Sequence, residues 1–363
     1  MNAFFRGILP DRVPFTPTLY VDHACVATGR RFEDALIDPS IAPMAMLEAA
    51  LFYGTDMVRM TMGPDAAWYE EKTVREENGS LIQFNRLTGA REGIYDTAGS
   101  GSFIPDTKPL PVRTVTDVEG IQVRSAAEYR ERGCFTHVKR AIAEAHAKGL
   151  FVIGMVSGQT LNFMVRELGD TETALMTFYD DPALAYALIN KAVAISIERG
   201  KAFVEAGVDG LYFGDSYASA SVISPEIYEQ FCLPAYREVA SEFHRAGVFC
   251  YKHCCGRYMP FIQHLPAIGI DAMDGIDPES NNVLAEVKQQ IGAKISLMGG
   301  MSCLTYLSGT PDAVYDEAAR CIRDAKAGGR FALGSGCAIP RATPKANILA
   351  ARQATIDHGA YRH

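Results

Sequence analysis

Short apolar runs that alternate with segments of helical pattern are the feature that most restricts the fold of this chain. Eight runs have the length and the apolar content of buried strands, at residues 13–19, 56–62, 150–156, 210–213, 248–251, 270–273, 294–298 and 330–333. Helical segments are expected between them, such as 182–206, which begins with Pro182 after two aspartates, and 225–246, which follows Ser224 as a cap. Repeated strand–helix units predict a parallel sheet, and eight units predict an α/β fold of the (β/α)8 TIM-barrel type.

One stretch, at about 66–117, departs from this alternation. Polar and apolar residues alternate there around two turn signals, Asn78-Gly79 and Thr88-Gly89, which is typical of β-hairpins. We therefore expect a β-hairpin insertion after the second strand. A chain of 363 residues could form one large barrel or two smaller domains, and the eight units favour a single barrel domain over residues 1–363.

The segment Tyr251-Lys-His-Cys-Cys-Gly256 predicts a metal site. His253 and Cys255 lie two residues apart at the end of an apolar run, so on an extended strand they share one face while Cys254 points away. Cys337 follows another short strand and can add a second sulfur. One imidazole and two thiolates, with a fourth position free, is the donor set of a catalytic zinc site.

Polar residues also follow the other predicted strands. Barrel enzymes carry their chemistry on the loops after the carboxyl ends of the strands. We expect catalytic roles for Asp215 and Tyr217, although a turn cap equally explains Asp215. The expected substrate-binding residues are Ser157, Gln159, Ser216, Asp274 and Ser335, of which Asp274 also fits a helix cap.

Composition narrows the class of protein. A formal net charge of -8 and a pI near 5.6, with no basic run, argue against a nucleic-acid partner. No apolar stretch reaches the roughly 18 residues that a membrane span needs, and no signal peptide is evident, so a cytoplasmic location is expected. Nine scattered cysteines do not resemble a disulfide framework and are expected to be thiols or metal ligands.

Three motifs carry a resemblance that covers nearly the whole chain. They are Gly7-Ile-Leu-Pro-Asp-Arg-Val-Pro14, Gly210-Leu-Tyr-Phe-Gly-Asp-Ser216, and Leu333-Gly-Ser-Gly-Cys-Ala-Ile-Pro340. With them the chain resembles the uroporphyrinogen decarboxylase superfamily, and within it the zinc-dependent cobamide methyltransferase branch. That branch has a His-x-Cys pair and a later cysteine as zinc ligands. The resemblance therefore implies the same three ligands, His253, Cys255 and Cys337.

The resemblance implies methyl transfer between a corrinoid and a small molecule. The small molecule would be a thiol such as coenzyme M, a folate, or an O-methyl or N-methyl compound. The chain has no Asp-x-His-x-x-Gly cobalamin-binding pattern, so the corrinoid is expected on a partner protein. The decarboxylase itself has an Arg-Gln-Ala-Gly-Arg segment that is absent here, and its Gly-His-Gly is replaced by Gly334-Ser335-Gly336.

Two alternatives remain open from the sequence. One is a decarboxylase-like lyase without zinc, in which Asp215 would stabilise a developing cationic ring and Cys337 would have no role. The other is a protein that binds a corrinoid protein without turnover. The sequence does not identify the methyl donor, the acceptor or the direction of transfer.

Overall fold

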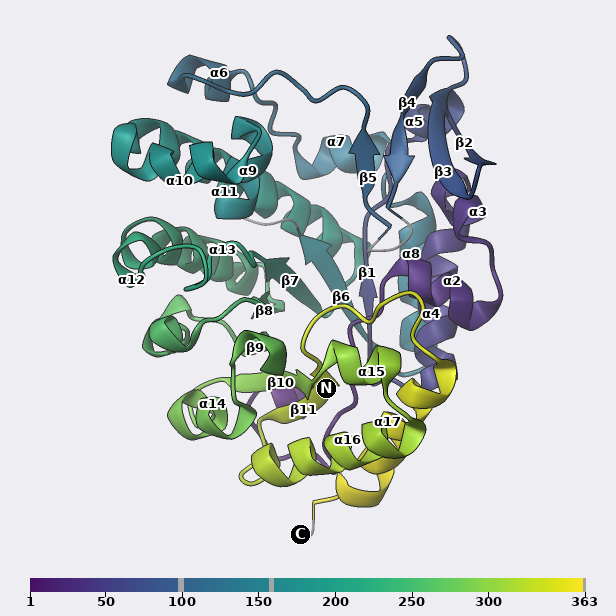
Figure 1. Ribbon diagram of the computed structural model, residues 1–363, viewed down its shortest axis with the longest axis vertical. Helices are drawn as coiled ribbons and strands as arrows, with labels where there is room; N and C mark the ends of the chain where they lie inside the picture. Colours follow the sequence, from purple (N-terminus) through teal and green to yellow (C-terminus); the bar gives the residue numbers. More distant parts are fainter. Residues whose placement is uncertain (97–100, 157–159, 362–363) are drawn as a thin grey trace.

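The structure is a computed structural model that describes residues 1–96, 101–156 and 160–361. Its centre is a curled parallel sheet of seven strands, in the order β1-β6-β7-β8-β9-β10-β11 (Figure 1). The strands are β1 (Met57–Met60), β6 (Phe151–Val156), β7 (Gly210–Gly214), β8 (Phe249–His253), β9 (Ala272–Ile276), β10 (Ser296–Met301) and β11 (Phe331–Ser335). Each of the seven overlaps one of the runs that the sequence predicts to be a strand.

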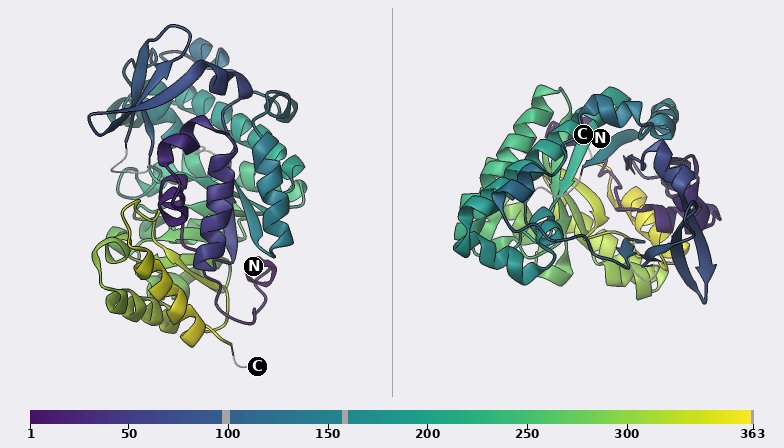
Figure 2. Two further views of the ribbon diagram at one scale, coloured as in Figure 1. Left: turned by 90° about the vertical axis from the view of Figure 1, so that its right-hand side faces the viewer. Right: turned by 90° about the horizontal axis from the view of Figure 1, so that it is seen from above.

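Helices surround this sheet, as the view from above in Figure 2 shows. The longer ones are α4 (Ile41–Tyr53), α8 (Thr136–Ala147), α10 (Thr171–Asp180), α11 (Pro182–Ala206), α13 (Leu233–Arg245), α16 (Pro311–Ala325) and α17 (Lys345–His358). Shorter ones are α2 (Val21–Thr28), α3 (Phe32–Ile37), α6 (Val115–Glu119), α7 (Ala126–Glu131), α9 (Leu161–Leu168), α12 (Pro225–Ile227), α14 (Leu284–Ile291) and α15 (Cys303–Ser308). The predicted caps are confirmed, because Asp181 accepts the Leu184 amide and Ser224 accepts the Ile227 amide.

The first predicted strand, residues 13–19, is wrong as a continuous strand. It makes only two isolated bridges, Phe15 with Leu333 and Thr18 with Ala338. Pro14 and Pro17 interrupt it, and a proline has no amide hydrogen to donate to a ladder. The segment is nevertheless seated beside β1, because the amide of Asp56 donates to the Phe15 carbonyl at 2.9 Å.

A second, antiparallel sheet lies between β1 and β6 in the chain. Helix α5 (Ala66–Glu71) leads into β2 (Lys72–Glu77), β3 (Ser80–Asn85), β4 (Arg91–Tyr95) and β5 (Phe103–Pro105), which pair in sequence order. Asn78 and Gly79 form the β2–β3 turn with φ values of 52° and 77°, the left-handed region that this turn type requires. In Figure 1 this sheet stands at one end of the molecule, beyond the carboxyl end of β1.

The interior of the curled sheet is filled from its amino end by helix α1 (Asn2–Phe5). The Phe5 ring stacks on Phe151 at 5.1 Å and on Phe249 at 5.4 Å between ring centroids. These rings pack with Met57, Tyr212, Tyr251 and Met298 in a core separate from the larger one between sheet and helices. Because apolar side chains occupy the amino end, polar groups can gather only toward the carboxyl end.

Three aspartates hold the amino edge of the sheet. Asp56, Asp209 and Asp271 each stand directly before a strand, and each accepts an amide from the neighbouring segment: Phe15 at 2.7 Å, Val152 at 2.7 Å and Cys250 at 2.8 Å. Each carboxylate also contacts a basic side chain, namely Arg12, His146 and His244 respectively. This edge is therefore built for stability.

The His244–Asp271 pair predicts a pH dependence of stability. His244 donates a hydrogen bond to Asp271 at 2.9 Å, and this bond raises the pKa of His244. A raised folded-state pKa stabilises the protein fully below the unfolded value of about 6.5, and this stabilisation is lost as the pH rises through the raised pKa. In urea unfolding, His244→Gln should cost about 0.5 kcal/mol near pH 5.5, since the pair is partly exposed, and less near pH 9. A cost that grows with pH would contradict this assignment.

Among the described residues, no helix combines the length and the apolar character that crossing a membrane requires.

Candidate metal centre

Three predicted ligands converge at the carboxyl edge of the parallel sheet. His253 is the last residue of β8, Cys255 follows it by two residues, and Cys337 follows the end of β11 by two residues. One donor atom from each of them lies within 4.8 Å of the other two. The imidazole is buried and both cysteines are partly buried. A nitrogen and two sulfurs at this spacing suit zinc, whose bonds to such donors are about 2.0–2.3 Å long.

The His253 ring is fixed by its neighbour on β9. Its Nδ1 lies 3.1 Å from Asp274 Oδ2. Burial lowers the pKa of His253, but hydrogen bonds with Asp274 and Cys255 outweigh it and raise that pKa to about 9. An imidazole whose one nitrogen is bonded to a carboxylate presents the other to a metal, the usual support of a zinc histidine.

The two thiols differ in acidity. The hydrogen bond with Cys337 lowers the pKa of Cys255, and a hydrogen bond with His253 lowers it further. The hydrogen bond with Cys255 raises the pKa of Cys337. Cys255 Sγ also lies 3.2 Å from the Ser216 hydroxyl oxygen. Cys255 is therefore the readier thiolate of the pair, and a dication bound between the two sulfurs would displace the remaining proton.

A buried arginine, which sequence reasoning missed, completes this network. Arg59 on β1 lies 3.6 Å from Asp274, and both side chains are at most 2% exposed. Arg59 also donates to the Tyr251 hydroxyl at 2.8 Å and to the Pro17 carbonyl at 3.0 Å. Its charge balances the carboxylate that holds His253. The signal was present in the sequence, as a single charge within the apolar run of β1.

The backbone around His253 leaves no room for a further side chain. Gly275, at φ 85°, faces the chain after β8, and a Cβ placed on it would lie 2.9 Å from the Cys254 carbonyl and 3.0 Å from His253 Cε1. A Cβ on Gly336 would lie 2.6 Å from an Asp277 carboxylate oxygen. Real Cβ atoms do not approach this closely, so glycine is required at both positions.

Asp215, predicted to be catalytic, is completely buried and has all its contacts within the protein. Its carboxylate accepts the amides of Thr160 at 2.7 Å and Asn162 at 3.0 Å, and the Tyr236 hydroxyl at 3.1 Å. This differs from the local turn cap that the sequence allowed as an alternative, because these amides open α9 and lie 55 and 53 residues away in the chain. A catalytic role stays a prediction that no contact here supports.

The remaining predicted residues have different surroundings. Ser216 lies beside the Cys255 sulfur, as described above, and Tyr217 next to it in the chain is 42% exposed. Asp274 lies within β9 and contacts His253, so it neither follows its strand nor caps a helix. Ser335 is buried and accepts the Thr18 amide at 3.0 Å. Ser157 and Gln159 lie outside the described residues.

A nearby third thiol differs from the other two. Cys303, at the start of α15, donates to the Ala338 carbonyl at 3.5 Å. Burial raises the pKa of Cys303 to about 12, so this thiol keeps its proton. Cys303 does not belong to the group of described donor atoms that lie within 4.8 Å of one another, so it is not one of the predicted ligands.

Another group with ligand-like spacing, His244, Cys250 and Asp271, lies at the amino edge. Its carboxylate already accepts an amide and contacts the imidazole, and burial raises the pKa of Cys250 well above its ordinary value. The same His–Asp device recurs at His146 and Asp209, where no cysteine takes part. These contacts describe a structural link.

The chain is similar to known proteins in sequence. The family model described as uroporphyrinogen decarboxylase matches residues 98–358. The chain is 27% identical over 250 residues to a methylated-thiol–coenzyme M methyltransferase of Methanosarcina mazei, a match that covers 68% of this chain and 64% of that relative, just under two thirds of its length. It is 23% identical over 322 residues to the methylcobamide:CoM methyltransferase MtbA of Methanosarcina acetivorans, covering 84% of this chain and 91% of the relative.

Two further matches extend the comparison. A uroporphyrinogen decarboxylase of Chlorobium luteolum is 31% identical over 170 residues, but covers only 44% of this chain and 45% of the relative. Among solved structures, a methyltransferase from Methanosarcina mazei superposes with a TM-score of 0.73 at 21% identity, covering 98% of this chain and 96% of that one. At this identity the superposition shows the shared fold.

Proposed function

Because the chain belongs to the uroporphyrinogen decarboxylase family, we propose that it uses the family fold for methyl transfer between a corrinoid on a partner protein and a small molecule. The observation that carries this proposal is the convergence of His253, Cys255 and Cys337 to within 4.8 Å. A decarboxylase has no evident use for two thiolates beside an imidazole. The two relatives named methylcobamide:CoM methyltransferase MtbA also match 84% of the chain, against 44% for a uroporphyrinogen decarboxylase.

Zinc held by these three residues would act as a Lewis acid, either on a thiol acceptor or on the ether or amine of a methyl donor. The protein's own residues prepare that position. Asp274 orients His253. Burial raises the pKa of Asp274, but the hydrogen bond with His253 and the charges of His253 and Arg59 outweigh it and lower that pKa. When Cys255 is a thiolate, the Ser216 hydroxyl donates a hydrogen bond to its sulfur and so holds the sulfur in place. In this proposal Asp215 is a positioning residue, and Tyr217 is the exposed side chain nearest to an incoming substrate.

We further propose that the fold is one (β/α)8 barrel over residues 1–363, with the antiparallel sheet as its insertion. The support is the seam between β11 and β1. Residues 13–19 bridge to β11, and the Asp56 amide donates to Phe15, so this segment occupies the place of an eighth strand. The formal charge of -8 agrees with a protein that does not bind nucleic acid. A cytoplasmic location is part of the same proposal.

The decisive experiment measures metal and turnover together. The purified chain should contain about one zinc per chain, the stoichiometry of a three-ligand catalytic site. It should demethylate methylcobalamin in the presence of a thiol or a folate, followed by the absorbance of the cobalamin. Uroporphyrinogen decarboxylation by zinc-free protein would establish the lyase. Binding of a corrinoid protein without any turnover would establish a binding module.

A proton count tests how the metal would act. An ordinary thiol keeps its proton below about pH 8.5. If zinc activates a thiol substrate, the thiol loses that proton on binding, because the dication stabilises the thiolate. Calorimetry at neutral pH in buffers of different ionisation enthalpy should report about one proton released per thiol bound. Cys255→Ala should abolish this release. An identical heat in all buffers, with zinc present, would contradict thiol activation and favour demethylation of an ether or amine.

A further inference from the structure

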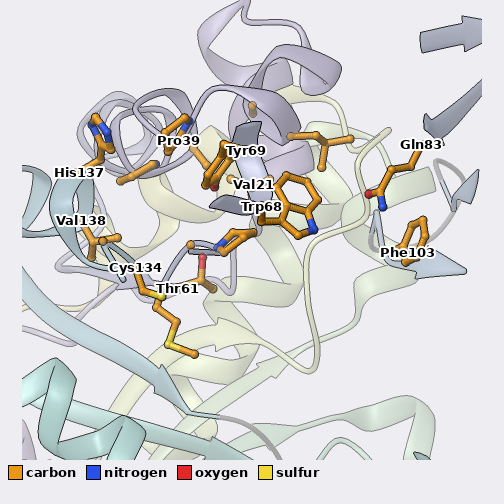
Figure 3. Close-up of a pocket in the computed structure, with 18 of the residues that line it drawn as sticks. Val21, Pro39, Thr61, Trp68, Tyr69, Gln83, Phe103, Cys134, His137 and Val138 are labelled. Carbon is orange, nitrogen blue, oxygen red and sulfur yellow. The ribbon is translucent and has the colours of Figure 1, made fainter. Parts of the chain in front are cut away.

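A cavity of about 400 Å³ lies beside the carboxyl end of β1 and apart from the metal ligands. Its walls come from three parts of the chain: helices α2, α3 and α4, the start of α8, and the antiparallel sheet with α5. Figure 3 shows Trp68 between the helical side, with Cys134 and His137, and the strand side, with Gln83 and Phe103. A volume of this size matches small-molecule sites in proteins.

The lining is aromatic and apolar. Trp68, Tyr69, Tyr95 and Phe103 line it together with alanine, proline, leucine and valine side chains. The rings of Trp68 and Tyr69 meet edge to face, with centroids 5.1 Å apart, and those of Tyr95 and Phe103 are tilted at 53°, with centroids 5.3 Å apart. Paired rings in these orientations offer faces and edges to a further planar ring. An aliphatic lining alone would not discriminate between ring types.

No lysine, arginine, aspartate or glutamate is among the described residues that line the cavity. Its polar side chains include the Gln83 amide, the Tyr69 hydroxyl and the His137 imidazole. The Gln83 amide is held in place, since it donates to Glu92 at 2.8 Å and accepts from the Tyr95 hydroxyl at 2.6 Å. Burial raises the pKa of Tyr69 to about 12, so its phenol stays protonated. A charged ligand would lose its hydration here without gaining a countercharge.

The cavity lies on the carboxyl edge of the sheet, where this fold binds small molecules. Thr61 and Met62, which line it, directly follow the last residue of β1. Val21, the first residue of α2, also lines it. The cavity and the predicted metal centre thus both lie toward the carboxyl edge of the sheet.

We propose that this cavity binds a neutral aromatic small molecule of one or two rings. The rings that line it supply affinity for a planar ligand. The described lining holds no lysine or arginine, so it offers no permanent positive charge to a carboxylate, a sulfonate or a phosphate. This goes beyond the proposed methyl transfer, which leaves the small molecule undefined. The binding proposal stands on the cavity alone, so its failure would leave the zinc assignment untouched.

The chain contains a single tryptophan, and it lines this cavity, so tryptophan fluorescence reports on occupancy directly. Titration of the full chain with 2-methoxyphenol should change the fluorescence saturably. Benzoate and cyclohexanol should each bind at least about tenfold more weakly, the first because of its charge and the second because it is not aromatic. In Trp68→Phe the signal should vanish while calorimetry still detects the ligand. The absence of saturable binding, or equal binding of benzoate, would overturn the proposal.

Filling the cavity provides the matched variants. Ala42→Phe on α4 and Ala35→Phe on α3 each add a ring to the empty volume and should weaken binding at least about tenfold. Ala143→Phe, at an exposed position of α8, makes the same substitution away from the cavity and should leave binding unchanged. Circular dichroism identifies which filling variant is folded, and ligand binding is then compared between that variant and the unaltered chain. Undiminished binding in a folded filling variant would place the ligand elsewhere and overturn the proposal.

Discussion

Replacing Cys337 with alanine is expected to remove most of the bound zinc while leaving the fold intact. The side chain is one of only three proteinaceous donors at the proposed centre, and it reaches the other two from a different strand. Loss of a ligand costs more than loss of a supporting residue, which already lowers metal affinity about 10- to 100-fold. Metal analysis after dialysis against a mild chelator, with circular dichroism of the same sample, measures both effects.

Cys303→Ala is the matched control for this experiment. It removes a thiol from the same neighbourhood, but that thiol keeps its proton and donates to a backbone carbonyl. The control should retain zinc and methyl transfer. Full zinc in Cys337→Ala would show that the metal is held by other residues, and equal loss in both variants would show that the effect comes from packing rather than ligation.

Replacing Asp274 with asparagine is expected to lower both stability and metal affinity. Arg59 would remain charged in a site where its side chain is 2% exposed, and breaking one partner of a buried pair costs roughly 3–5 kcal/mol. The same substitution removes the carboxylate that orients His253, which should weaken zinc binding about 10- to 100-fold. Urea unfolding of the zinc-free protein isolates the first effect, and competition with a chromophoric chelator measures the second.

An exposed pair of the same residue types supplies the control. Arg91 and Asp106 lie 2.9 Å apart on the antiparallel sheet, with 49% and 39% of their side chains exposed. Asp106→Asn should change the free energy of unfolding by less than about 1 kcal/mol, because water screens such pairs. Replacing Arg59 with methionine in the Asp274→Asn background should restore part of the lost stability. Similar losses in the buried and exposed variants would contradict the role given to the Arg59–Asp274 pair.

The sequence predicts the parallel sheet well, because each strand is a short apolar run between helix signals. Seven of the eight expected strands are present, and α11 has the predicted bounds. The first expected strand fails at Pro14 and Pro17, whose missing amides break the ladder. The apolar pattern predicts burial, and residues 13–19 are indeed buried. The pattern does not predict which backbone amides can donate a hydrogen bond to a neighbouring strand.

The sequence predicted that His253, Cys255 and Cys337 converge, but it did not predict the residues that hold them in place. His253 and Cys255 are close in sequence, and Cys337 is marked by its place after a strand. The role of Arg59 depends on strand order, which brings β1 beside the seam with β11, and no local pattern shows this. The contacts of Asp215 could not be predicted for a similar reason, since its partners Thr160 and Tyr236 lie 55 and 21 residues away. The cavity is formed by the antiparallel sheet and helices whose packing no motif describes.

The links made by Asp56, Asp209 and Asp271 have a consequence for how such a protein can change. They fasten neighbouring segments at the amino edge, while the metal ligands and the cavity occupy the carboxyl edge. Sites on opposite edges of a sheet share few contacts, and distant substitutions tend to act additively. Loops that select a substrate can therefore diverge among descendants of this fold without loosening the sheet that carries them.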